Sequence, residues 1–241
     1  MFNFSSTTFD NFSMKKSVIY IVAALSAAIL LGSCATTKKS DVYATIYSEK
    51  PEVFLIMPPI NNSNYVEAKD CFYTTMNVPL AEAGYYVLPP AAVYDTMQRE
   101  SAYDSERFID GSLKKFNQLF GCDVAVFTII KSWDKSLVGS AIVIEIEYIF
   151  KSAKTDEVLF RRDATIKCDT STGTSTNSLL GSLIIAAVDA VKTAVSEYVD
   201  VAVRCNNTAL SDLPAGKYSP KYGLDGADSA MGEKITITAS K

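Results

Sequence analysis

The sequence predicts a single-domain α/β protein in which a mixed β-sheet is packed with helices in the order β-α-β-α-α-β-β-β-α. Short apolar runs alternate with stretches of helical periodicity, and the later strands change from continuous to alternating hydrophobicity. The chain has 241 residues with 48% hydrophobic content, which suffices for one core. We therefore expect one α/β domain, contained in residues 51–205.

Proline and glycine mark the ends of the early elements. An apolar run closes at Pro58 and Pro59, and a helical stretch ends at Gly84 after Pro79, which should kink or restart the helix. Pro90 suits the first turn of the next helix. The expected elements are a strand over 52–57, a helix over 65–83, a strand over 85–88, and helices over 90–97 and 112–121. The side chains expected to face the core from the last two helices are Ala91, Tyr94, Met97, Leu113, Phe116, Leu119 and Phe120.

The second half predicts three strands and a long helix. Residues 123–131 are apolar without alternation, which is typical of a strand covered on both faces. Residues 140–150 alternate, with apolar side chains on one face and Glu145 and Glu147 on a wetter face, and residues 158–166 follow as an antiparallel partner. Residues 179–204 predict a helix whose first half, apolar nearly all round, indicates a core or subunit interface. Residues 206–241 predict an extended C-terminal tail.

The N-terminus carries the pattern of a lipoprotein export signal. Lys15 and Lys16 precede a nearly continuous apolar run over residues 17–31, and Gly32-Ser33-Cys34 follows. Small residues before a cysteine resemble the bacterial lipobox, in which the cysteine is acylated and then becomes the first residue. We expect residues 1–33 to be a signal peptide, with Met14 as an alternative start, Cys34 to be the lipidation site and residues 34–50 to form a polar tether. The alternative is an ordinary signal peptide that contains a cysteine.

The anchor determines the expected location. Acyl chains on one cysteine hold a protein permanently on a membrane, because each buried methylene contributes about 0.8 kcal/mol. Ala35 stands where an aspartate would favour retention in the inner membrane. The sequence therefore predicts an outer-membrane lipoprotein whose domain faces the periplasm.

The amino-acid composition limits the kinds of ligand and catalysis that we expect of this protein. The formal charge is −4 and the basic residues are scattered, so no surface for nucleic acid is expected. Histidine is absent, which removes the commonest general base and metal ligand, and we expect no metal or cofactor. Glu145 and Glu147 lie roughly 6 to 7 Å apart along one strand face, a separation also used by glycoside hydrolases. Like charges at this spacing are more often a solvated face.

Two further groups of residues are candidates for function. The loop of Pro58, Pro59, Asn61, Asn62 and Ser63 follows the carboxyl end of a strand, where open α/β sheets place ligands, although a bare turn is the simpler interpretation. The cysteines at positions 71, 122, 168 and 205 permit up to two disulfides in an oxidising compartment, and Cys168 with Cys205 is the first pair to test. The alternative is that most are free and buried.

Five segments together resemble a family of bacterial lipoproteins defined by domain of unknown function 799, which includes a vaccine-candidate surface antigen. The segments that carry the resemblance are residues 53–63 (VFLIMPPINNS), 79–87 (PLAEAGYYV), 120–127 (FGCDVAVF), 133–134 (WD) and 213–220 (LPAGKYSP). The resemblance covers most of residues 50–224. It implies a periplasmic α/β domain similar to the N-terminal domain of TolB and a genetic association with a lipoprotein similar to the secretion channel CsgG. It supplies no catalytic residue.

These observations favour a lipid-anchored scaffolding or partner-binding component of a secretion-channel-like envelope complex, without catalysis. One alternative is a periplasmic enzyme that acts on glycans or small molecules through Glu145 and Glu147. Another is a homo-oligomer in which the long helix over residues 179–204 is the contact surface.

Overall fold

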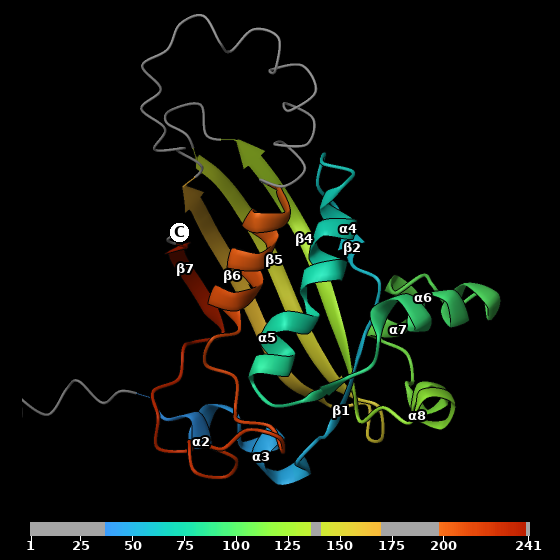
Figure 1. Ribbon diagram of the computed structural model, residues 1–241, viewed down its shortest axis with the longest axis vertical. Coiled ribbons are helices and arrows are strands. Elements are labelled where there is room, and N and C mark those ends of the chain that lie inside the picture. The colour runs from blue at the N-terminus through green and yellow to red at the C-terminus, as the bar shows by residue number, and fades with distance from the viewer. Residues whose placement is uncertain (1–36, 136–140, 170–197, 240–241) are drawn as a thin grey trace, which may run out of the picture. The chain divides into compact units, whose positions relative to one another are not determined.

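The computed structural model describes residues 37–135, 141–169 and 198–239 (Figure 1). Its strands are β1 (Val53–Ile56), β2 (Ile60–Asn61), β3 (Tyr86–Val87), β4 (Val124–Lys135), β5 (Ala141–Ser152), β6 (Val158–Asp169) and β7 (Lys234–Ala239). Its helices are α2 (Lys39–Val42), α3 (Ala44–Glu49), α4 (Ala68–Thr75), α5 (Asn77–Glu82), α6 (Pro90–Arg99), α7 (Glu106–Ile109) and α8 (Lys114–Phe120), and residues 198–209 are also helical. The predicted α/β class is confirmed.

The strands form one seven-stranded mixed sheet in the order β3-β1-β4-β5-β6-β7, with β2 beside β4. The pairs β1–β3, β1–β4, β2–β4 and β6–β7 are parallel, whereas β4, β5 and β6 run antiparallel. The predicted antiparallel partnership of β5 and β6 is therefore confirmed. The order of elements also holds, with α2, α3, β2, α7 and β7 added to it.

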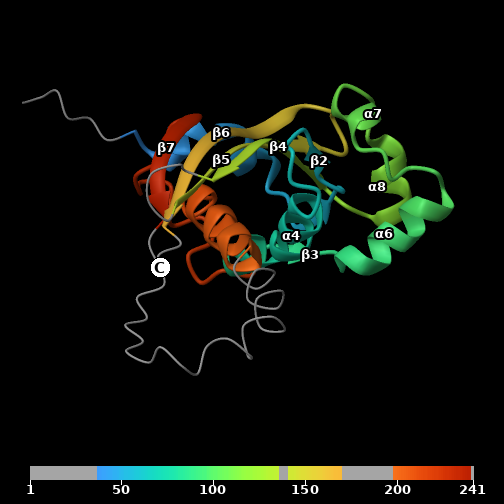
Figure 2. The same cartoon turned by 90° about the horizontal axis from the view of Figure 1, so that it is seen from above.

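Two hydrophobic clusters lie on opposite faces of the sheet. On the first face, the even-numbered side chains of β5 are buried with those of α4, α5 and the helix over 198–209, as the alternation predicts. On the second face, Leu55, Ala125 and Phe127 pack with side chains from α6 and α8. Figure 2 shows α6, α7 and α8 gathered away from β6 and β7. The second face is therefore covered by helices only over part of the sheet.

The helix expected over residues 65–83 is two helices. α4 ends before Met76 and α5 restarts at Asn77, with Pro79 in the first turn of α5, where its missing N–H removes no helical hydrogen bond. Gly84 ends the segment with a φ of +94°, as predicted. Pro90 opens α6, again as predicted.

The apolar faces predicted for α6 and α8 are partly wrong. In α6 the buried residues are Val93 and Met97, which lie one turn apart, while Ala91 is exposed. Leu113 and Phe116 are buried, but Leu119 is 58% exposed. α8 has only seven residues; Phe116 is its buried residue, and Phe120 packs against the same cluster while partly exposed.

The polar tether predicted over residues 34–50 is wrong beyond Thr37. Residues 39–49 form α2 and α3, and Tyr43 and Ile46 are buried in the first cluster. Lys39 is also buried, because Asp225 compensates its charge. The folded domain therefore begins at about residue 38 instead of 51.

The extended C-terminal tail predicted over residues 206–241 is also wrong. Residues 206–209 continue the helix past its predicted end, Leu213 is 4% exposed, and β7 adds a parallel strand beside β6. Ile235 and Ile237 alternate with polar residues and pack against the first cluster. This period of two is the strand signal that the overall composition of the segment obscures.

Two expectations lie outside the described residues: the signal peptide with Cys34 and the first part of the long helix over residues 179–204. Within the described residues, no helix has the length and apolarity needed to cross a membrane.

Candidate functional site

The candidate loop at residues 58–63 is tied to its own surroundings. The Ser105 hydroxyl donates to the carbonyl of Pro58 at 2.6 Å, and the Asn62 amide donates to Ile130 at 2.9 Å. The Asn61 side chain accepts from the Ser63 hydroxyl at 2.6 Å and donates to the carbonyl of Tyr65 at 2.8 Å. Most polar groups of the loop are therefore satisfied internally, which supports the simpler interpretation of a turn.

The two prolines of this loop nevertheless border a groove. Pro58 and Pro59 form one wall of a cavity of about 230 Å³, and Tyr73 and Tyr94 contribute aromatic rings whose centroids lie 5.9 Å apart. The Tyr73 hydroxyl donates to the carbonyl of Pro90 at 2.8 Å, so this ring is held in place. The surface that the loop presents to a ligand is therefore mainly apolar and has few free hydrogen-bonding groups.

Glu145 and Glu147 lie on the second face of the sheet, where the alternation placed them, but they do not form a free pair. Glu147 contacts Lys131 at 3.1 Å and Arg161 at 3.4 Å, and Lys131 also contacts Asp163 at 3.0 Å. Both carboxylate oxygens of Glu147 are thus engaged by cations, Oε2 by Lys131 and Oε1 by Arg161. The arrangement is typical of a solvated, ion-paired sheet face.

The four cysteines of the domain are all buried thiols. Burial raises the pKa of Cys122 to about 12, which disfavours the reactive thiolate. Cys168 on β6 and Cys205 on the helix over 198–209 lie with their sulfur atoms 3.5 Å apart. The structure thus brings together the pair that the sequence singled out and leaves Cys71 and Cys122 apart from it.

A larger groove lies between α6, α7 and α8, with a volume of about 420 Å³. Leu119 stands on its rim and is 58% exposed, and Phe108, Phe116 and Phe120 contribute aromatic surface. The charged residues that line it are Glu100, Arg107 and Lys115. This groove was not predicted from the sequence, because Leu119 was expected to face the core. The length of α8, limited by Ser112 and Gly121, was the available signal, since a seven-residue helix cannot turn all of its apolar side chains toward the core.

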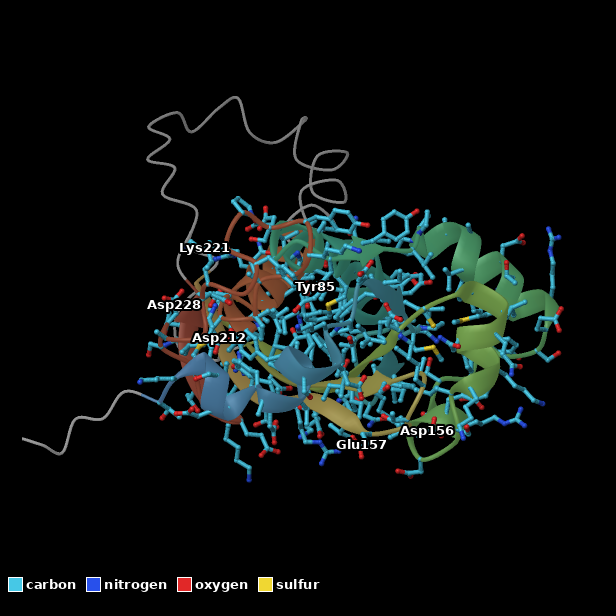
Figure 3. The ribbon with its side chains drawn as sticks, turned by 90° about the horizontal axis from the view of Figure 1, so that it is seen from below. Tyr85, Asp156, Glu157, Asp212, Lys221 and Asp228 are labelled. Atoms are coloured by element: carbon cyan, nitrogen blue, oxygen red, sulfur yellow. The ribbon has the colours of Figure 1, made fainter. Side chains whose placement is uncertain are left out.

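Two buried ion pairs, which the sequence did not reveal, hold the C-terminal segment: one joins it to the N-terminal helices and the other to β6. The Lys39 ammonium lies 3.1 Å from Asp225, which also accepts from the Tyr47 hydroxyl at 2.9 Å. Arg162 of β6 is 1% exposed and pairs with Asp212. Figure 3 shows Asp212 and Asp228 on the C-terminal segment beside the N-terminal helices, away from Asp156 and Glu157.

Both buried carboxylates are held ionised. Burial alone would raise the pKa of Asp212, but hydrogen bonds from Arg162 and Tyr43 outweigh it and lower that pKa below its usual range. The pKa of Asp225 is lowered in the same way. Burial would raise it, but hydrogen bonds from the Ala215 amide, Lys39 and Tyr47 outweigh burial. Burial also raises the pKa of the Tyr43 hydroxyl, which stays protonated as a donor. These groups serve the fold and offer no free acid or base.

Among residues 37–135, 141–169 and 198–239, no three metal-binding side chains of the His, Cys, Asp or Glu type are grouped. Besides the two grooves, the described residues line a hollow of about 440 Å³ bordered by α2, α3 and β6.

Comparisons with known proteins agree with the sequence motifs. A model of GNA1162-like lipoproteins matches residues 41–217. The lipoprotein NMB1124/NMB1162 of Neisseria meningitidis serogroup B (strain ATCC BAA-335 / MC58) is 25% identical over 180 residues, which make up 73% of this chain and 83% of the relative.

Three solved structures are similar to parts of this chain. The crystal structure of lipoprotein GNA1162 from Neisseria meningitidis has a TM-score of 0.46 and 25% identity, covering 59% of this chain and 99% of that one. A PelC dodecamer from Paraburkholderia phytofirmans has a TM-score of 0.39 and 11% identity, covering 69% and 88%. The LpoB C-terminal domain from Salmonella enterica has a TM-score of 0.36 and 11% identity, covering 54% and 98%.

Proposed function

Because this chain belongs to the family of GNA1162-like lipoproteins, we propose that acyl chains on Cys34 anchor it in the outer membrane and that its periplasmic domain works by binding a partner, without catalysis. The export signal and the small residues before Cys34 support the anchor. The partner we propose is a second envelope lipoprotein of the secretion-channel type, similar to CsgG.

The observation that carries the binding role is the groove between α6, α7 and α8. Leu119 exposes more than half of its side chain beside three phenylalanines, and Arg107 and Lys115 lie at the same groove. Protein interfaces combine an apolar centre with a charged rim, and aromatic residues and arginine are enriched in them. The groove has this composition.

The alternative of a glycan- or small-molecule-acting enzyme finds less support. Its two carboxylates would have to share the work of an acid and a base. Lys131 and Arg161 hold Glu147 by ion pairs, so the more buried of the two carboxylates is already neutralised within the sheet.

The test is co-purification of the acylated full-length protein after crosslinking in living cells. We expect one outer-membrane lipoprotein to co-purify with the wild type and to be lost with Leu119→Asp. The matched control is Val158→Asp, which places the same charge at another exposed apolar position, 47% exposed on β6. Recovery of no envelope protein, or undiminished recovery with Leu119→Asp, would contradict the proposal.

A further inference from the structure

The connection between the acylation site and the folded domain is short. The Lys39 amide donates to the carbonyl of Asp228 at 2.9 Å and the Ser40 amide to that of Gly226 at 3.0 Å, so the chain is fixed to the domain from Lys38 onward. Only residues 35–37 separate Lys38 from Cys34. A fully extended backbone therefore spans at most about 14 Å between these two residues. The headgroup layer of a bilayer is itself roughly 5 to 8 Å thick.

An exposed apolar surface lies next to this attachment point. Nine large apolar side chains are exposed on the described residues, and three of them lie between positions 218 and 224. Tyr218 is 65% exposed, Tyr222 is 43% exposed and Leu224 is 79% exposed. Val42 on α2, 39% exposed, is a fourth. We refer to residues 217–224 as the docking loop.

The docking loop is held rigidly. Gly216 donates to the carbonyl of Ala83 at 2.8 Å and Tyr218 to that of Gly84 at 2.9 Å, while the Ala215 amide donates to Asp225 at 2.9 Å. The backbones approach so closely that a Cβ on Gly216 would lie 2.4 Å from the carbonyl oxygen of Gly84. The exposed side chains therefore stand on a fixed platform that is tied through Asp225 to Lys39.

We propose that the docking loop rests on the phospholipid surface of the leaflet that holds the anchor. Tyrosine is enriched at membrane–water interfaces, and Leu224 can enter the acyl boundary beside it. Lys221, which precedes Tyr222, can extend its alkyl stem along the surface and reach phosphate groups, whereas Lys217 is paired with Glu52. The contact fixes the orientation of the domain, so that its remaining surfaces face the periplasm. This inference rests on the proposed acylation of Cys34.

The experiment places an environment-sensitive fluorophore on an introduced cysteine in the acylated full-length protein. The test variant is Leu224→Cys and the matched control is Val66→Cys, an apolar position that is 81% exposed. Val66 is next to Tyr65, whose ring packs on Trp133 of β4. The docking loop lies near the start of β1, at the end of the sheet where β1 pairs with Val124 of β4. Trp133 and Val124 are nine residues apart on β4, which corresponds to about 30 Å along the strand. Figure 1 shows the segment before α4 and the pair α2 and α3 at opposite ends of the sheet.

The labelled proteins are reconstituted into vesicles of phosphatidylethanolamine with a minority of phosphatidylglycerol, and co-flotation is measured first. We expect the emission at position 224 to rise at least about twofold and shift to shorter wavelength, and to be quenched by brominated lipids. We expect neither change at position 66. The native cysteines are buried and should stay unlabelled, which the protein without an added cysteine checks.

Each other result overturns the inference in a recognisable way. If the protein floats with the vesicles but the label at position 224 stays in water, the anchor stands and the docking surface is wrong. The loop would then be open to a protein partner instead. If the protein does not float because it carries no acyl chains, the proposed anchor fails, and the docking surface fails with it.

Discussion

The buried ammonium of Lys39 lies 3.1 Å from the carboxylate of Asp225, although the two residues are 186 positions apart in the chain. This pair joins the first helix of the domain to the C-terminal segment. Both residues are buried, although they lie in the segments that were predicted to be a polar tether, residues 34–50, and an extended tail, residues 206–241.

Removing this carboxylate should destabilise the domain. Asp225→Ala leaves the Lys39 charge buried without a counter-charge, with only the carbonyl of Leu213 as an acceptor, and removes acceptors for Tyr47 and the Ala215 amide. We expect the free energy of unfolding to fall by about 3 kcal/mol, measured by urea denaturation. Asp228→Ala, an exposed position three residues away, is the control and should change it by less than about 0.5 kcal/mol. Equal effects of the two variants would show that the pair contributes nothing.

Acid should weaken the domain. The pKa values of Asp212 and Asp225 are lowered by their hydrogen-bonded partners, so each ionised carboxylate stabilises the fold. That stabilisation is complete above the unfolded pKa of about 3.9 and is lost as the pH falls through the lower folded pKa. The chain has no histidine that could titrate at higher pH. We expect a urea midpoint that is level between about pH 5 and 8 and falls below about pH 4. A midpoint that rises on acidification would be contrary to this assignment.

The close backbone approach at Gly216 should not tolerate a side chain. A Cβ there would lie 2.4 Å from the Gly84 carbonyl oxygen, and neither backbone can move without breaking the hydrogen bonds that join them. Gly216→Ala should lower the free energy of unfolding by about 2 kcal/mol. At Gly226 the nearest atom to an added Cβ is 3.5 Å away, an ordinary contact, so Gly226→Ala serves as the control. A harmless Gly216→Ala would mean that the loop is not held as described.

The ion-paired sheet face should be dispensable for function. Glu145→Gln with Glu147→Gln removes both carboxylates and breaks the contacts of Glu147 with Lys131 and Arg161. Because these groups are partly solvated, we expect a stability loss of at most about 1 kcal/mol. Detergent sensitivity of cells that carry the double variant should match that of the wild type. Sensitivity equal to that of a deletion strain would revive the enzymatic alternative.

Oxidation should select one pair of cysteines. The sulfur atoms of Cys168 and Cys205 lie 3.5 Å apart and need only a small movement to reach bonding distance. We expect a mild oxidant to link these two residues, detected by mass spectrometry of the digested protein without reductant. Cys71 and Cys122 should remain alkylatable after unfolding. A linkage that includes either of them would contradict the positions of β6 and the helix over 198–209.

Local patterns in the sequence predict the central fold because those elements are defined by their neighbours in the chain. The alternation in β5, the helix end at Gly84 and the helix start at Pro90 all depend on residues within or next to one element. The burial of Lys39 depends on Asp225, and that of Arg162 on Asp212, so no local window contains the information. β7 did carry a local signal, its period of two, which the polar residues before it outweighed.

The candidate site was predicted less well for the same physical reason. The loop at residues 58–63 could be located from a strand end, but two of the hydrogen bonds that hold it are made to Ser105 and Ile130, which are distant in the chain. The exposure of Leu119 follows from how little of α8 the sheet can cover, which is a property of packing.

The most direct test of this account is the mass of the N-terminal peptide of the protein purified from membranes. The account predicts that the mature chain begins at Cys34 and that this residue carries a diacylglyceryl group, which Cys34→Ser abolishes together with membrane retention. An unmodified Cys34, or a Cys34→Ser protein that is processed and retained like the wild type, would contradict it.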